Sequence, residues 1–183
     1  MESLNLFILQ QVIKKRSSHE EGTIQDLKKQ KFHFQKLVQS IDSLSDGQAT
    51  LSYNDDNFRE FSVHISPNDG PYKGGKVGFN FKMKPSYPST PPQITCQNII
   101  YHPNIDDEGD ICLSVLNEWS SQNNDLVDCI QGLLYLLHYP NLEDPLSPFF
   151  APGEDENEFQ ENVKLTMAGS VFNGVIFDCL LSQ

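Results

Sequence analysis

The chain has 183 residues, a length that fits one domain of about 150 residues with an extension. Its 25 acidic and 13 basic residues give a net charge of −12, which argues against binding to nucleic acid, because that binding needs clustered lysine and arginine. The four scattered cysteines lack zinc-ligand spacing and the density of a disulfide framework, and no apolar run approaches the roughly 20 residues of a membrane span. We therefore expect a protein of the cytoplasm and nucleus with protein partners, no metal and no membrane contact.

The first 22 residues are predicted to form a flexible docking tail, separate from a core domain over residues 23–183. The tail begins with an apolar patch that includes Leu4, Phe7 and Leu9, and continues with a basic cluster and a polar linker. Such a patch has no core of its own to join. It either folds back on the domain or inserts into a groove of a partner.

The core is predicted to start with an amphipathic helix, for which Thr23 is a plausible N-cap. Lysines, Lys28 and Lys29 among them, give this helix a basic face. That face is either a solvated surface or a docking site for an acidic partner. Apolar residues recur along the helix with near-helical spacing at Ile24, Leu27, Phe32, Phe34, Leu37, Val38 and Ile41.

Strand patterns follow in the next part of the chain. Alternating apolar and polar residues predict strands over 50–53, 58–65 and 77–83, and a short edge strand is expected over 94–96. The turn residues between them favour an antiparallel meander. Before the last strand, residues 87–92 contain three prolines, which exclude both a helix and a central strand there.

Helices are predicted for the last third of the chain. Asp125 can cap a helix that runs to about His138 and is apolar on much of its circumference, as expected for a central buried helix. A short acidic helix over 154–167 and a last helix over 171–181 complete the prediction. The order of elements indicates an α+β domain: an N-terminal helix, a four-stranded antiparallel meander, an irregular loop, a central helix and C-terminal helices.

The irregular loop lies between His102 and Cys112. Pro103 fixes its own backbone angle φ, and Asn104 with the acidic run that follows supplies turn residues, so this segment cannot be a helix. A cysteine reached through such a loop can act as a nucleophile. The alternative is that Cys112 is a small buried apolar residue of the core.

Several short motifs occur in a fixed order along the core: residues 70–75, Tyr87-Pro88 with Pro91-Pro92, His102-Pro103-Asn104, residues 109–113, Trp119, and Asp144-Pro145-Leu146. In their order and spacing over about residues 24–165 they resemble the ubiquitin-conjugating enzyme family. This resemblance implies the fold of that family. It also implies that Cys112 carries the C-terminal carboxylate of a ubiquitin-like modifier as a thioester and passes it to an amine.

The tail and residues 159–180 resemble the neddylation branch of that family, which carries the ubiquitin-like modifier of cullins. By this resemblance, Phe7 and Leu9 anchor the tail on a heterodimeric activating enzyme, and Met1 and Leu4 anchor it on a cullin co-ligase. A RING-type ligase would assist transfer, and the protein would act as a monomer. The alternatives are a carrier for ubiquitin itself and a non-catalytic binding module of the same fold.

Thioester exchange needs a thiolate, a stabilised oxyanion and a nucleophilic lysine. Asn104 either donates a hydrogen bond toward the tetrahedral oxygen or holds the loop through turn hydrogen bonds. His102, next to Pro103, is either a base for Cys112 or, as the resemblance favours, a structural brace. Asp144 either positions the incoming lysine or caps a turn. No phosphate-binding glycine motif is present, so we expect no cofactor, and ATP would be consumed by the activating enzyme.

Overall fold

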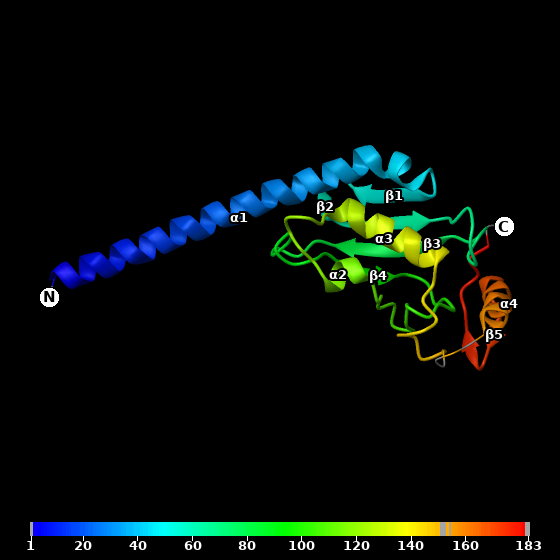
Figure 1. Cartoon of the computed structure of the whole chain (residues 1–183). Helices are drawn as coiled ribbons and strands as arrows, with labels where there is room; N and C mark the ends of the chain where they lie inside the picture. Colours follow the sequence, from blue (N-terminus) through cyan, green and yellow to red (C-terminus); the bar gives the residue numbers. More distant parts are fainter. Residues whose placement is uncertain (1, 151–152, 154, 182–183) are drawn as a thin grey trace.

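The computed structural model describes the backbone of residues 2–150, 153 and 155–181, and the side chains of these residues from Gly22 onwards. Helices and strands are segregated along the chain, as in an α+β domain (Figure 1). The elements are α1 (Glu2–Ser45), β1 (Ala49–Asn54), β2 (Asn57–Ile65), β3 (Val77–Lys82), β4 (Gln93–Cys96), α2 (Ser114–Asn117), α3 (Leu126–His138), α4 (Glu156–Met167), β5 (Val171–Phe172) and β6 (Val175–Ile176).

The main sheet confirms the predicted antiparallel meander, with the strand order β1-β2-β3-β4. Along β2, the buried residues Phe61, Val63 and Ile65 alternate with less buried ones, so one face of the sheet is turned to the core. Phe61 pairs with Phe81 on β3, and their rings stack with centroids 5.0 Å apart. This pairing fixes the register, because a slip by one residue would turn the apolar side chains to the solvent.

The central helix α3 begins and ends close to where the sequence predicts. Asp125 forms a capping box: its side chain accepts a hydrogen bond from the N–H of Val127 at 2.7 Å, and its own N–H donates to Asp128 at 2.7 Å. The helix packs against α1, and Lys36 of α1 pairs with Asp125 at 2.6 Å. The buried residues of α3 are Leu126, Cys129, Ile130, Leu133, Leu134, Leu136 and Leu137.

Helix α1 is longer than predicted, because it begins at Glu2 and not at Thr23. No proline and only one glycine occur in residues 2–45, so nothing in the sequence forces a break at the predicted linker. Figure 1 shows α1 projecting far beyond the rest of the molecule. Of the described helices, none is long and apolar enough to cross a membrane.

Only part of the predicted apolar face of α1 is buried. Phe34, Leu37 and Ile41 join the core, whereas Ile24 and Phe32 are 55% and 64% exposed. Gln30 is only 1% exposed, so α1 still packs against the body of the molecule there. Phe32 lies two residues from both Gln30 and Phe34, which places it on the opposite side of the helix. Helical periodicity therefore predicted the helix but not which of its apolar residues are buried.

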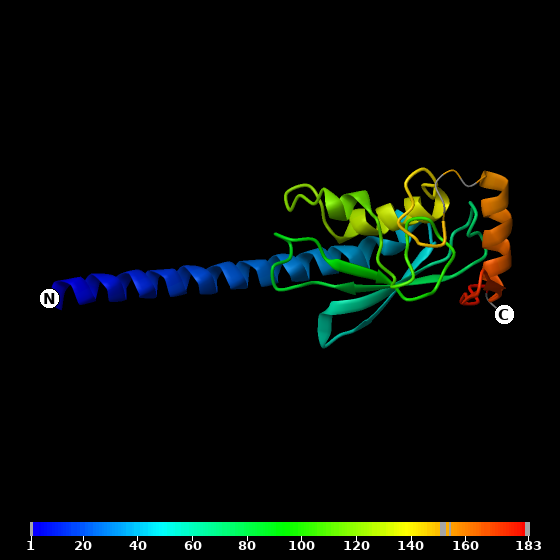
Figure 2. The ribbon, with the colours of Figure 1, turned by 90° about the horizontal axis from the view of Figure 1, so that it is seen from below.

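The C-terminal part contains one correction. Helix α4 confirms the predicted acidic helix, with Asp155 as its N-cap. The helix predicted over 171–181 is wrong, because β5 and β6 form a hairpin there. Asn173 and Gly174 connect the two strands with positive φ angles of 50° and 81°, which two-residue hairpin turns require. Figures 1 and 2 both place α4 and this hairpin at the end of the molecule opposite the N-terminus.

Candidate active site

The loop that leads to Cys112 is held by short-range hydrogen bonds. Asp106 Oδ1 accepts from the N–H groups of Glu108 and Asp110, at 3.0 and 2.8 Å. Gly109 has a φ of +84°, and a Cβ built on it would lie 2.5 Å from the carbonyl oxygen of Cys96. Only glycine allows the loop to pass this close to the end of β4.

Cys112 itself is exposed at the end of this loop. Its N–H donates to the carbonyl oxygen of Asn104 at 2.9 Å, which fixes its backbone, while its Sγ lies 4.0 Å from Asn117 Nδ2 of α2. The next residue, Leu113, is buried instead. The alternative that Cys112 is a buried apolar residue is therefore wrong, and its sulfur is accessible to a reactant.

Two other cysteines differ from Cys112 in a way that affects reactivity. Cys96 and Cys129 are buried. Burial raises the pKa of the Cys96 thiol to about 12 and also raises the pKa of Cys129, because a thiolate is poorly solvated there. Since the thiolate is the nucleophilic form, these two residues are unsuited to exchange chemistry.

His102 braces the loop from inside the core. It is fully buried, its Nδ1 accepts from the N–H of Asn104 at 2.9 Å, and its Nε2 lies 3.2 Å from the carbonyl oxygen of Leu136, to which it donates. Burial lowers the pKa of His102 to about 3, against a smaller opposing effect of the Leu136 hydrogen bond. Both ring nitrogens are engaged, which supports the bracing role and not that of a base for Cys112.

Asn104 is also buried, and its side chain pairs with the backbone of Asn141. Its Nδ2 donates to the Asn141 carbonyl at 3.0 Å, and its Oδ1 accepts from the Asn141 N–H at 2.8 Å. These bonds connect the loop with the segment after α3. They use the amide oxygen and one of the two hydrogens on Nδ2, so both ends of the amide help to hold the loop.

Asp144 is brought close to the same loop by its neighbours. The carbonyl oxygen of Pro103 accepts from the N–H groups of Leu146 and Ser147, at 2.8 and 2.9 Å. Pro103 is buried, so these bonds anchor the turn to the body of the molecule, while Asp144 itself is exposed. The structure thus gathers the predicted residues Cys112, Asn104, His102, Pro103 and the Asp144 turn into one region.

The predicted partner-binding residues lie elsewhere. Lys28 and Lys29 are exposed on α1. Met1 and the side chains of Leu4, Phe7 and Leu9 lie outside the described residues, so their docking roles stay predictions. The contacts of Asn141 and Asn117 were not predicted from the sequence. At Asn141 the sequence indicated only a turn, because an asparagine follows a proline there.

Asn104→Ala is expected to lower the free energy of unfolding by about 1–3 kcal/mol, because the two hydrogen bonds between the buried Asn104 side chain and the backbone of Asn141 are lost. Urea denaturation measures this change. Asn123→Ala is the control, since Asn123 is exposed in the loop before α3 and should change stability little. Equal stability of Asn104→Ala and the wild type would contradict the bracing role.

Comparisons with known proteins identify the family of the chain. The family model described as "Ubiquitin-conjugating enzyme" matches residues 33–167. The "NEDD8-conjugating enzyme UBC12" of Yarrowia lipolytica is 41% identical over 123 residues, which are 66% of this chain and 69% of the relative. The protein of the same name from Kluyveromyces lactis is 34% identical over 164 residues, 88% of this chain and 89% of the relative.

A solved structure described as "S. cerevisiae Ubc12" has the same architecture. It superposes with a TM-score of 0.72 and 30% sequence identity, over 97% of this chain and 99% of that one. The family match spans most of the core, including the whole loop from His102 to Cys112. The chain belongs to the ubiquitin-conjugating enzyme family.

Proposed function

We propose that this protein is a conjugating enzyme for NEDD8, the modifier after which these relatives are named. It would accept the activated modifier as a thioester on Cys112 and transfer it to lysines of target proteins, which the sequence resemblance implies are cullins. The single observation that supports this best is an exposed thiol fixed by a braced loop in a chain of this family.

The chemistry consists of two exchanges at one carbonyl carbon. In the first, the Cys112 thiolate attacks the thioester on the activating enzyme, and the thiolate of that enzyme leaves. In the second, a neutral lysine amine attacks the thioester on Cys112, an amide forms, and the Cys112 thiolate leaves as the amine loses a proton. We assign the positioning of the loop to His102 and Asn104.

The partners follow from the same proposal. A heterodimeric activating enzyme would spend the ATP, so this chain needs no cofactor of its own. Phe7 and Leu9 would dock on that enzyme, with Lys28 and Lys29 adding positive charge, and Met1 and Leu4 would dock on a cullin co-ligase. A RING-type ligase would promote transfer from the monomeric enzyme in the cytoplasm and nucleus.

A modifier-selective charging assay tests the proposed function. The protein is incubated with ATP and either NEDD8 and its activating enzyme or ubiquitin and its activating enzyme, and adducts are resolved without reductant. We expect a reducible adduct with NEDD8 only. Exclusive loading with ubiquitin would favour the ubiquitin carrier, and no adduct with either modifier would favour a binding module.

Asp144→Asn tests the proposed role of Asp144 toward lysine. Its exposed carboxylate would hold the amine near the thioester and favour loss of its proton. We expect discharge to free lysine to slow by about 10²-fold, the lower range of acid–base effects, while loading of Cys112 and the melting temperature stay close to the wild type. Single-turnover discharge measures this, and equal slowing of loading and discharge would indicate a structural role.

A further inference from the structure

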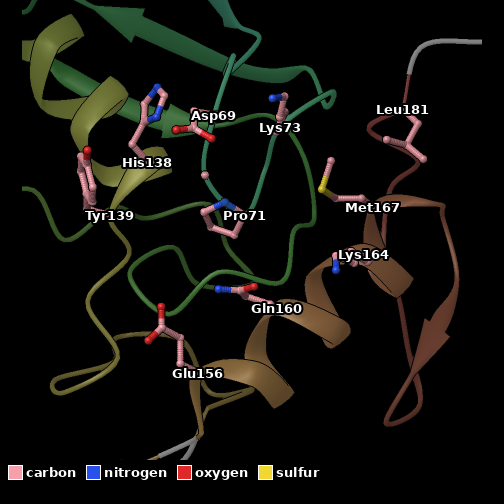
Figure 3. Close-up of a pocket in the computed structure, with 11 residues that line it drawn as sticks. Asp69, Pro71, Lys73, His138, Tyr139, Glu156, Gln160, Lys164, Met167 and Leu181 are labelled. Carbon is pink, nitrogen blue, oxygen red and sulfur yellow. The ribbon is translucent and has the colours of Figure 1, made fainter.

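A pocket of about 720 Å³ lies away from Cys112, between the β2–β3 loop, the end of α3 and one side of α4 (Figure 3). Gly70 brings the loop against α3: its φ is +77°, and a Cβ there would lie 3.0 Å from the carbonyl oxygen of His138. His138 is held in turn by a 2.9 Å hydrogen bond to Gln48. Two walls of the pocket are therefore fixed by the packing of the core.

The pocket has an apolar part that remains open to solvent. Pro71, Tyr139, Met167 and Leu181 line it, and Tyr139 and Leu181 are 65% and 43% exposed. Figure 3 shows Tyr139 on one side and Met167 with Leu181 on the other. An apolar side chain placed between them would gain burial that the protein alone does not provide.

The charged residues of the pocket carry equal numbers of positive and negative charges. Lys73 and Lys164 contribute two positive charges, and Asp69 and Glu156 contribute two negative ones. Within the described part of the chain, none of the four forms an ion pair. A pocket with both signs of charge matches neither nucleic acid nor an anionic membrane surface, and is complementary to a ligand that also carries both signs.

Helix α4 spaces these groups regularly. Glu156, Gln160 and Lys164 are one turn apart, so they point into the pocket at intervals of about 6 Å. Alternate side chains on one face of an extended peptide are about 6.6 Å apart. Figure 3 shows Gln160 between Glu156 and Lys164, where the Gln160 amide can form hydrogen bonds with the backbone of a bound peptide.

We propose that this pocket binds an extended segment of a partner protein, in which a basic and an acidic side chain are four residues apart with an apolar side chain midway between them. The acidic side chain meets Lys73 and Lys164, and the basic one meets Glu156. The apolar side chain enters between Tyr139 and Met167. This surface is separate from the thioester chemistry of the proposed function and extends it with a second contact for a partner.

A labelled peptide, acetyl-Lys-Ser-Leu-Ser-Glu-amide, tests the proposal on the full-length chain. We expect saturable binding by fluorescence anisotropy, with amide chemical-shift changes centred on Gln160 and Tyr139. Lys164→Glu should weaken binding at least about tenfold, because it replaces an attraction by a repulsion. Lys84→Glu is the matched control, since Lys84 is exposed and lies outside the pocket, and it should bind as the wild type does.

A charge-swapped peptide distinguishes a changed pocket charge from unfolding of the Lys164→Glu variant. The peptide with lysine in place of its glutamate should bind Lys164→Glu better than it binds the wild type. The proposal is overturned by absence of binding, by equal binding of a peptide with glutamine at both ends, or by equal binding to Lys164→Glu. The assay uses no modifier and no activating enzyme, so these outcomes leave the proposed function untouched.

Discussion

We expect Cys112→Ser to abolish the reducible adduct that forms when the protein is incubated with NEDD8, its activating enzyme and ATP. Cys112 combines an exposed sulfur with a backbone fixed by Asn104, so the thiol is both reachable and positioned. A serine hydroxyl is a weaker nucleophile at neutral pH, and any ester that it forms resists thiol reductants. Gel electrophoresis with and without reductant measures the loss, which should be complete.

Cys179→Ser is the matched control for this experiment. Cys179 is the other exposed cysteine of the described chain, and it lies near the C-terminal hairpin, outside the braced loop. Its replacement should leave charging at the wild-type level. An adduct that persists in Cys112→Ser and disappears in Cys179→Ser would show that the wrong thiol has been assigned.

Local patterns allowed most of the sheet and α3 to be predicted from the sequence. Alternation along β2 and a capping residue, Asp125, act over a few residues, so they can be recognised without knowledge of the fold. The C-terminal hairpin was missed although Asn173-Gly174 is a strong turn signal. Apolar residues on both sides of that turn have a spacing that also fits a helix, whereas the positive φ angles of Asn173 and Gly174 are incompatible with one.

The candidate site shows a different limit of prediction. Cys112, Asn104 and His102 lie close together in the sequence, and the loop chemistry around them indicated a site. The partner of Asn104 could not be predicted, because Asn141 is 37 residues away in the sequence, on the far side of α3. Likewise, the acceptor for His102 Nε2 is a carbonyl inside α3 that no sequence pattern marks.

Stability is expected to fall in acid because of His102. Its pKa in the folded protein is about 3, against 6.5 for an unperturbed histidine. Above pH 6.5 both states are neutral and the contribution is fully present. Below pH 6.5 the unfolded chain takes up a proton that the folded protein cannot, so stability is lost as pH falls toward 3. The loss amounts to about 2 kcal/mol between pH 7 and 5.

Urea denaturation at pH 7 and pH 5 measures this loss, and a His102→Gln variant should show a smaller difference between the two pH values. His64→Gln is the control: His64 is only partly buried on β2, so most of the acid loss should remain in that variant. If His102→Gln fails to fold, the ring can be followed by NMR in the wild type. Protonation of the folded His102 ring above pH 5 would contradict its assignment as a buried neutral brace.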